Sequence, residues 1–206
     1  MDQKNIPDIV VGRLPIYLRA LQRMAQDGAR LTSSQELSER LGISAAQIRK
    51  DLSQFGEFGK QGTGYQIEYL VEQLRQILQV DRVWPMVVIG AGDIGSAIAR
   101  YQGFTDRGFE VTHIFDNSQE KIGSRIGPFV VQDFTDLPNV IRAENIRVAM
   151  LAVPASQAQA VVDELVKAGI KAILNYAPIN IYVPDGVRVQ HTDPVTHLQR
   201  MTYYLE

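Results

Sequence analysis

The sequence predicts an α/β protein built from two domains, and three observations support this. The first eighty residues show helical periodicity with little strand character. Beyond them, apolar strand-like runs alternate with helical patterns, which is typical of a parallel sheet covered by helices. The segment Asp81–Pro85 between the two regions has neither pattern. We therefore expect one domain over residues 1–80 and a second over residues 81–206.

Composition excludes several classes of protein. Of 206 residues, 45% are hydrophobic and 21% charged, with no cysteine, so disulfides and thiolate metal sites are excluded. No apolar run suits a membrane span and no signal peptide is evident, which predicts a cytoplasmic protein. Residues 1–80 carry 10 Lys/Arg and 9 Asp/Glu, or +1, and the remainder carries 11 minus 14, or −3. Any DNA binding must therefore use a local basic surface.

The N-terminal region opens with a predicted amphipathic helix over Arg13–Gln26. Its apolar residues follow helical spacing and form one stripe: Leu14, Tyr17, Leu18, Leu21 and Met24. Arg13, Arg19 and Arg23 lie off this stripe, and Pro15 is expected to start or kink the helix.

A helix-turn-helix is predicted next, between Thr32 and Gly56. Ser33 with Glu36 fits a capping box, and Gly42 suits the end of the short helix that this box begins. Ser44 with Gln47 fits a second capping box two residues later. Two short helices joined by so tight a turn define the motif.

The second helix of this motif has a small, polar and basic outer face. At about 100° per residue, Ile48, Leu52 and Phe55 point inward, whereas the opposite side carries Ala46, Lys50 and Ser53, flanked by Arg49 and Gln54. Such a face suits entry into the DNA major groove. An ordinary solvated helix face is the alternative.

The segment that follows strengthens the DNA-binding hypothesis. Phe58–Tyr65 has three glycines around Lys60 and predicts a tight β-hairpin with a cation near its tip. A helix-turn-helix followed by such a hairpin is a winged helix, although a plain surface hairpin is the alternative. A linking helix is expected over Tyr69–Leu78.

A glycine-rich turn marks the second domain. The strand Met86–Ile89 leads into a G-x-G-x-x-G motif and then a helix, in the order of a Rossmann dinucleotide-binding unit. We expect its glycines to permit a tight turn, close approach of a pyrophosphate and close packing of helix on strand. The predicted cofactor-binding residues of this turn are Gly90, Ala91, Gly92, Asp93, Ile94 and Gly95.

An acidic residue follows at the spacing that this kind of site requires. The predicted strand Val111–Phe115 ends at Asp116, 21 residues after Gly95. A carboxylate there accepts hydrogen bonds from a ribose diol and repels a 2′-phosphate, which favours NAD(H) over NADP(H). Lys121 is the nearest cation and tempers this preference; a turn role for Asp116 is the alternative.

The alternation of strands and helices continues to the C-terminus. Expected strands are Phe129–Val131, Ile146–Val153 and Ala172–Leu174, and expected helices are Ala155–Ala168 and Thr196–Leu205. Ligands of such sheets bind beyond the strand carboxyl ends, which places Val153 and Pro154 near the pocket. The last helix, within about 195–206, is expected to dock on its own domain or on a partner chain.

Catalytic chemistry is not evident in the sequence. No Tyr-x-x-x-Lys pair occurs, and His113, His191 and His197 form no metal motif. We therefore expect no catalytic residue and no metal, and a dinucleotide that is held without being turned over. A small NAD-dependent oxidoreductase and a winged-helix regulator of another nucleotide, such as coenzyme A, are the alternatives.

At this point the sequence resembles the Rex family of bacterial redox-sensing transcriptional repressors, over nearly the whole chain. The resemblance rests on IPDIVVGRLPIYLRAL, SAAQIRKDLSQFGEFGKQGTGY, VVIGAGDIGSAIARY with IFDNSQEKIG, LAVPA, GIKAILNYAP and the Asp193 region. It implies a homodimer with a swapped C-terminal helix. Such a dimer binds palindromic operators of respiratory and fermentative genes when NADH is low and releases them when NADH binds, whereas NAD⁺ competes without causing release.

The resemblance also assigns roles to individual residues. The turn Gly90–Gly95 would hold pyrophosphate and Asp116 the ribose, with Val153 and Pro154 near the nicotinamide. The implied DNA contacts are Gln47, Arg49, Lys50 and Ser53 in the major groove and Lys60 in the minor groove. Arg19, Tyr101 and Asp193 match a trio that couples the domains across the dimer. The chain departs from the family pattern at Gln61 and Pro194.

Overall fold

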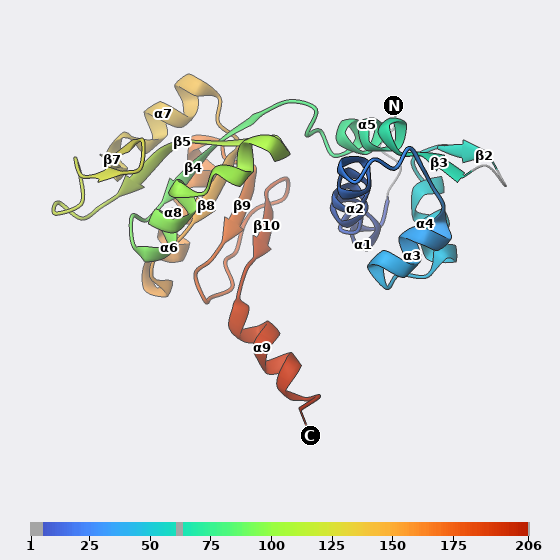
Figure 1. Cartoon of the computed structure of the whole chain (residues 1–206). Coiled ribbons are helices and arrows are strands. Elements are labelled where there is room, and N and C mark those ends of the chain that lie inside the picture. The colour runs from blue at the N-terminus through green and yellow to red at the C-terminus, as the bar shows by residue number, and fades with distance from the viewer. Residues whose placement is uncertain (1–5, 61–63, 206) are drawn as a thin grey trace. The chain divides into compact units, whose positions relative to one another are not determined.

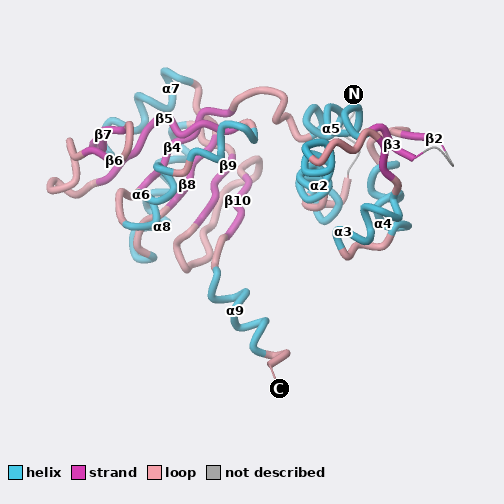
Figure 2. The backbone as a smooth tube through the Cα atoms, viewed as in Figure 1, coloured by secondary structure: helices cyan, strands magenta, loops and turns pink. Residues whose placement is uncertain are grey.

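The computed structural model describes residues 6–60 and 64–205, which form two compact units (Figures 1 and 2). Contacts divide the chain into Met1–Arg82 and Val83–Glu206. Each unit has its own hydrophobic core, as expected of separate domains.

The first unit consists of five helices and a small antiparallel sheet of order β1-β3-β2 among its described residues. The helices are α1 (Asp8–Val11), α2 (Leu14–Gln26), α3 (Ser34–Leu41), α4 (Ala45–Ser53) and α5 (Ile67–Ile77). The strands are β1 (Leu31–Thr32), β2 (Gly59–Lys60) and β3 (Gly64–Gln66). The order helix, strand, helix-turn-helix, hairpin and helix is that of a winged helix-turn-helix.

The apolar stripe predicted on the first helix forms the centre of this unit. All five of its residues are buried in α2. Four of them have no exposed surface: Leu14, Tyr17, Leu21 and Met24. Leu70 and Leu74 of α5 and Leu37 of α3 pack into the same cluster. The helix α2 therefore provides the apolar surface on which α3, α4 and α5 pack.

The serine half of each predicted capping box is confirmed. Ser33 Oγ accepts a hydrogen bond from the Glu36 N–H at 3.1 Å, and Ser44 Oγ accepts one from the Gln47 N–H at 3.2 Å. Gly42 ends α3 with φ +67°, a left-handed conformation that favours glycine. The tight turn between α3 and α4 therefore follows directly from the local sequence.

The second unit is a seven-stranded sheet of order β10-β9-β8-β4-β5-β7-β6, parallel except for β6. The strands are β4 (Trp84–Ile89), β5 (Phe109–Asp116), β6 (Arg125–Ile126), β7 (Phe129–Asp133), β8 (Val148–Leu151), β9 (Ala172–Asn175) and β10 (Arg188–His191). The helices are α6 (Asp93–Arg100), η1 (Gln102–Arg107), η2 (Phe134–Asp136), α7 (Leu137–Glu144), α8 (Ala155–Ala168) and α9 (Pro194–Thr202). Among the described residues, no helix is long and apolar enough to cross a membrane.

Helices cover both faces of the sheet, as the Rossmann prediction requires. Val87 and Ile89 of β4 pack with the buried faces of α7 and α8, whereas Met86 and Val88 of the same strand pack with α6. The chain runs from β4 outward to β5 and β7, then returns to form β8 on the other side of β4. The carboxyl ends of β4 and β8 thus flank the topological switch point, where ligands of open α/β sheets bind.

Several predicted boundaries are wrong, each for a physical reason. The strand expected over Ile146–Val153 is shorter, because the Ile146 N–H bonds the Ile141 carbonyl and so completes the end of α7. The last helix begins at Pro194, two residues earlier than expected, because Asp193 caps it. The helix α7 and the exposed, polar edge strand β10 were not predicted; neither has a long apolar pattern.

Candidate functional site

The three glycines of the turn after β4 each meet a different spatial demand. Gly90 has φ +99°, and a Cβ on it would lie 2.3 Å from the Ala152 carbonyl oxygen. A Cβ on Gly95 would lie 1.8 Å from the Gly90 carbonyl oxygen. A Cβ on Gly92 would meet no protein atom within 4 Å. The fold itself therefore requires Gly90 and Gly95, whereas the space beside Gly92 is left open for a ligand.

A cavity of about 830 Å³ opens beside this turn. It is bounded by the glycine turn and the start of α6, by the end of β5 with Asp116, and by the segment after β8 with Val153 and Pro154. Gly92, Asp93 and Ile94 all line it. The structure thus brings together, in one cavity, predicted cofactor-binding residues from three separate parts of the sequence.

The cavity wall also includes a helix N-terminus, a feature that favours phosphate groups. The helix α6 begins at Asp93, directly after Gly92, so its first N–H groups and positive dipole end face the cavity. Cavities of this size hold nucleotides and similar ligands, which bury most of their surface in such clefts.

Asp116 is buried and hydrogen-bonded both to the glycine turn and to the segment that follows β5. Its Oδ2 accepts from the Ala91 N–H at 2.7 Å and from Lys121 Nζ at 3.2 Å, and its Oδ1 accepts from the Ser118 N–H at 2.8 Å. Burial acts to raise the pKa of Asp116, but these three donors outweigh it and hold the pKa below its ordinary value. Asp116 therefore presents a permanent negative charge at the cavity wall.

This arrangement predicts a pH-dependent contribution of Asp116 to stability. Because the folded-state pKa of Asp116 is lowered, its carboxylate stabilises the fold above the unfolded pKa of about 3.9, and this is lost as the pH falls. We expect the thermal midpoint of Asp116→Asn to fall less between pH 6 and pH 3 than that of the wild type. Asp136→Asn, which changes an exposed carboxylate, is the control, and parallel curves for wild type and Asp116→Asn would refute the assignment.

Three predicted DNA-contact residues lie on the exposed side of α4. Arg49, Lys50 and Ser53 are exposed, as the helical angle predicts. Arg49 Nη1 donates to Ser34 Oγ at 2.8 Å, which orients the guanidinium over the start of α3, and Ser53 Oγ donates to the Lys50 carbonyl at 2.9 Å. Lys50 lies on the same exposed side of the helix, where its side chain reaches solvent.

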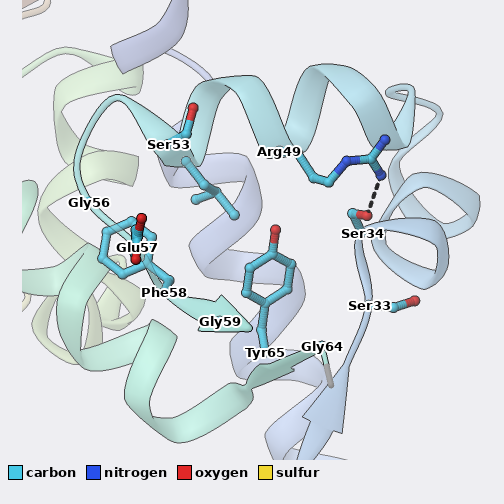
Figure 3. Close-up of a pocket in the computed structure, with 11 residues that line it drawn as sticks. Ser33, Ser34, Arg49, Ser53, Gly56, Glu57, Phe58, Gly59, Gly64 and Tyr65 are labelled. Carbon is cyan, nitrogen blue, oxygen red and sulfur yellow. Dashed lines mark hydrogen bonds between the residues drawn. The ribbon is translucent and has the colours of Figure 1, made fainter. Parts of the chain in front are cut away.

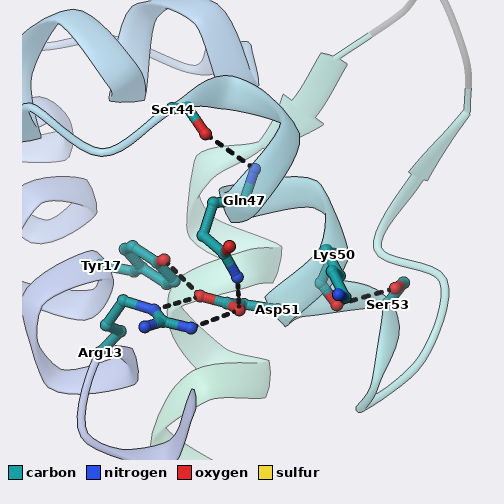
Figure 4. Close-up of polar contacts among 7 residues, drawn as sticks. All are labelled: Arg13, Tyr17, Ser44, Gln47, Lys50, Asp51 and Ser53. Atoms are coloured by element: carbon teal, nitrogen blue, oxygen red, sulfur yellow. Dashed lines mark hydrogen bonds and ion pairs between the residues drawn. The ribbon is translucent and has the colours of Figure 1, made fainter. Parts of the chain in front are cut away.

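Gln47, the fourth predicted contact, has a different environment. Its side chain is half-buried, and Nε2 donates to Asp51 Oδ1 at 2.7 Å instead of turning back to Ser44 as a capping box would require (Figure 4). Asp51 also accepts from Arg13 and from the Tyr17 hydroxyl. The sequence reasoning missed this network; the one available signal was an acidic residue next to the buried Leu52 on an otherwise basic helix.

A second cavity, of about 820 Å³, lies between α4, the start of α3 and the hairpin (Figure 3). Arg49, Ser53 and Tyr65 line it. Burial raises the pKa of the Tyr65 hydroxyl, and Arg49 partly offsets the rise. The backbone of Lys60 pairs with Gly64 in the hairpin, whereas its side chain and Gln61 lie outside the described residues.

The predicted coupling residues are distributed over both units. Arg19 is exposed on α2. Tyr101 is exposed at the end of α6, and its ring packs edge-on against that of Phe104, with the two ring centroids 4.9 Å apart. Asp193 accepts from the Val195 N–H at 2.9 Å and from Thr196 Oγ1 at 2.9 Å, so it caps α9. Pro194 occupies the first turn, where a missing N–H costs nothing, so this departure from the family pattern fits the helix.

Metal chemistry has no support from the described residues. In residues 6–60 and 64–205, no group of three or more His, Cys, Asp or Glu side chains is arranged to hold a metal ion. His113 lies 3.5 Å from Glu144, away from the glycine turn, and His191 contacts the buried Asn175 amide at 3.1 Å.

A winged helix-turn-helix followed by a Rossmann unit with an open nucleotide cavity defines a ligand-responsive transcription regulator. Two family models match: "Putative DNA-binding protein N-terminus" over residues 5–53 and "CoA binding domain" over residues 81–179. The chain belongs to the Rex family of redox-sensing transcriptional repressors. It is 51% identical over all 206 residues to the Rex repressor of Chloroflexus aurantiacus, spanning 97% of that protein. It is 41% identical over 199 residues to the Rex repressor of Carboxydothermus hydrogenoformans, and the match spans 96% of that protein.

Solved structures of a relative match both units together. The crystal structure of RSP in complex with β-NAD⁺ and operator DNA matches with a TM-score of 0.93 and 38% identity, covering 98% of this chain and 94% of that one. The crystal structure of RSP in complex with β-NADH matches with a TM-score of 0.89 and 36% identity, covering 98% of this chain and 95% of that one.

Proposed function

We propose that this chain is a repressor that binds operator DNA through its winged helix and releases it when NADH occupies the cavity beside Gly92. The observation that carries this proposal is the pairing, in one chain, of a basic recognition helix with a dinucleotide cavity whose wall holds an ionised Asp116. The RSP structures support it, because that relative was solved with both nucleotides and with operator DNA.

The chemistry of the cavity favours NAD(H) over other nucleotides. The N-terminus of α6 and the space at Gly92 suit a pyrophosphate, and Asp116 suits an unphosphorylated ribose. Lys121 lines the cavity and is bonded to Asp116, which weakens but does not remove the charge that opposes a 2′-phosphate. Coenzyme A, named by the matching family model, is the competitor to include in binding assays.

Discrimination between NADH and NAD⁺ must arise from a difference in closure around the ring. A ligand that binds both protein states equally shifts no equilibrium. Val153 and Pro154, which line the cavity after β8, are the proposed nicotinamide contacts, and their apolar surface suits the neutral reduced ring better than the cationic oxidised ring. The RSP complex that holds β-NAD⁺ together with operator DNA is consistent with release by NADH alone.

The nucleotide is proposed to be sensed and not turned over, by a homodimer. No Tyr-x-x-x-Lys pair is present in the sequence. Val195, Leu198 and Met201 of α9 are each more than half exposed, and no residue of α9 is buried in this single chain. A partner chain is the proposed cover for this apolar face, with the C-terminal helix, about 195–206, swapped between the two.

Lys50 provides the test of the DNA-binding half of this proposal. We expect Lys50→Ala to weaken operator binding about tenfold and to reduce the slope of log K against log salt by about one, because a phosphate contact is lost. NADH affinity should not change. Lys167→Ala, which removes an exposed lysine from α8, is the control. Equal loss of operator and NADH binding in Lys50→Ala would contradict a separate role for the first unit.

Asp193 provides the test of coupling. Asp193→Ala also removes the α9 cap, so Asp193→Asn is the sharper variant. It keeps an oxygen for the Val195 N–H and removes the charge together with the second oxygen, which accepts from Thr196 Oγ1. We expect Asp193→Asn to bind both operator and NADH but to need at least about tenfold more NADH for release, equivalent to about 1.4 kcal/mol of coupling. Normal release measured by anisotropy would refute the role of Asp193 in coupling.

A further inference from the structure

Asp51 is a buried carboxylate that the proposed DNA contacts do not use. It lies in the recognition helix α4 and, alone among carboxylates of the described residues, has no exposed surface. Arg13 donates two hydrogen bonds to its carboxylate, from Nε at 2.5 Å and from Nη2 at 2.8 Å, and the Tyr17 hydroxyl donates a third at 2.6 Å (Figure 4). Gln47 adds a fourth bond at 2.7 Å.

Stability alone does not account for this network. Taking a carboxylate and a guanidinium out of water costs much of what their attraction returns, and apolar residues of similar size often stabilise a fold equally well. Burial acts to raise the pKa of Asp51, but the bonds from Arg13, Tyr17 and Gln47 prevail and keep the pKa lowered, so the charge persists. An ionised group in this position supplies directional bonds that an apolar contact lacks.

Those bonds connect two different helices. Arg13 and Tyr17 lie at the start of α2, and Asp51 lies near the end of α4. Apolar packing through Ile48 and Leu52 tolerates small rotations of α4 about its axis, whereas a two-pronged guanidinium contact and a hydroxyl bond do not. The network therefore specifies which side chains of α4 face outward.

The bond to Gln47 has a further consequence. A carboxylate only accepts hydrogen bonds, so Gln47 must present its NH₂ group to Asp51, which directs Oε1 away from it. Gln47 lies one turn before Lys50 on the same helix. An amide held in this orientation presents an acceptor, which suits the exocyclic amino groups of cytosine or adenine in the major groove.

We propose that Asp51 is a positioning residue for operator reading: it holds the Gln47 amide in one orientation and fixes the rotation of α4 against α2. Asp51 itself touches no DNA. The inference rests on the proposed function, because it requires that the first unit reads an operator. Discrimination between bases, as distinct from general affinity for DNA, would then depend on Asp51, a residue outside the contact surface.

The test compares two dissociation constants of the full-length dimer at fixed salt. One is for the operator duplex that the wild type selects from a random library, and the other is for an unrelated duplex of equal length. Asp51→Asn should lower the ratio of the two at least about tenfold, the value of one good base contact. Binding to the unrelated duplex should change less than about twofold, because Arg49 and Lys50 remain exposed.

The chain offers a matched control. Gln35 Nε2 donates to Glu39 on α3 with the same four-residue spacing, but that pair is exposed. Glu39→Gln makes the same charge change as Asp51→Asn and should leave the ratio unchanged. Adding Gln47→Ala to Asp51→Asn should lower the ratio no further, since both act on one contact.

A second variant keeps the test valid if Asp51→Asn does not fold. Arg13→Met, Tyr17→Phe and Asp51→Leu together remove the network without leaving an unpaired buried charge. This variant should fold and show the same loss of discrimination. A folded variant of either kind that keeps the wild-type ratio would overturn the inference alone. A wild type with no preference for any duplex would overturn the proposed function, and the inference with it.

Discussion

Gly92→Ala is expected to weaken NADH binding while leaving the fold intact. The added Cβ meets no protein atom within 4 Å, and the backbone at Gly92, with φ −81°, accepts alanine without strain. The methyl group instead enters the space proposed for the pyrophosphate. A steric conflict of one methyl group costs about 1–3 kcal/mol, so NADH affinity should fall by a factor between about 5 and about 140.

Isothermal titration with NADH and a thermal melt of the free protein measure the two effects of Gly92→Ala separately. Gly12→Ala adds the same methyl group to the C-cap glycine of α1, whose φ of −62° also accepts alanine, and serves as the control. Operator binding without nucleotide should be normal in both variants. Unchanged NADH affinity in Gly92→Ala would place the dinucleotide elsewhere, and a lowered melting temperature would show that the glycine serves the fold instead.

Gly95→Ala, only three residues further on, is expected to have the opposite effect. Its Cβ would lie 1.8 Å from the Gly90 carbonyl oxygen and 3.0 Å from the Gly90 carbonyl carbon. Neither atom is free to move, because the Gly90 N–H is bonded to the Phe115 carbonyl at 2.8 Å in the sheet. The helix α6 must therefore shift away from β4. We expect a loss of about 3 kcal/mol or more in the free energy of unfolding.

Calorimetry of the full-length protein tests Gly95→Ala, with a melting temperature lowered by roughly 10 °C as the expected result. Gly92→Ala is its natural comparison, because both variants add one methyl group to the same turn. Equal melting temperatures for the two variants would contradict the different roles assigned to these glycines.

Local signals explain why much of the first unit was predictable. The spacing of Leu14, Leu21 and Met24 reports a single buried face, and Ser33 and Ser44 satisfy N–H groups only three residues away. Each of these signals involves residues within one helix or its cap. The order of helices and hairpin then defines the winged helix without any long-range information.

The Asp51 network was not predictable for the same reason. Its partners lie 38 and 34 residues away, and only the packed arrangement of α2 against α4 reveals that Arg13 and Tyr17 reach the carboxylate. The helical projection placed Lys50 and Ser53 on the outer face, and only the family resemblance implied a DNA contact for Gln47. The structure turns its amide toward Asp51.

The second unit shows the same contrast. The glycine turn and Asp116 follow from spacing, whereas the bond between the Ala91 N–H and Asp116 requires β4 and β5 to be neighbours. The edge strand β10 escaped prediction because its residues Arg188–His191 are mostly exposed and carry no apolar alternation. Edge strands obtain their order from a neighbour, here β9, and not from their own sequence.

Fluorescence anisotropy of a labelled operator duplex measures whether this chain couples NADH binding to release of DNA. NADH, NAD⁺ and coenzyme A would be titrated separately into the preformed complex at fixed salt, because phosphate contacts make DNA affinity salt-dependent. We expect NADH to release the operator at concentrations at which NAD⁺ and coenzyme A leave the complex intact. An operator complex that is indifferent to NADH, or that NADH and NAD⁺ release equally, would rule out a redox-sensing repressor.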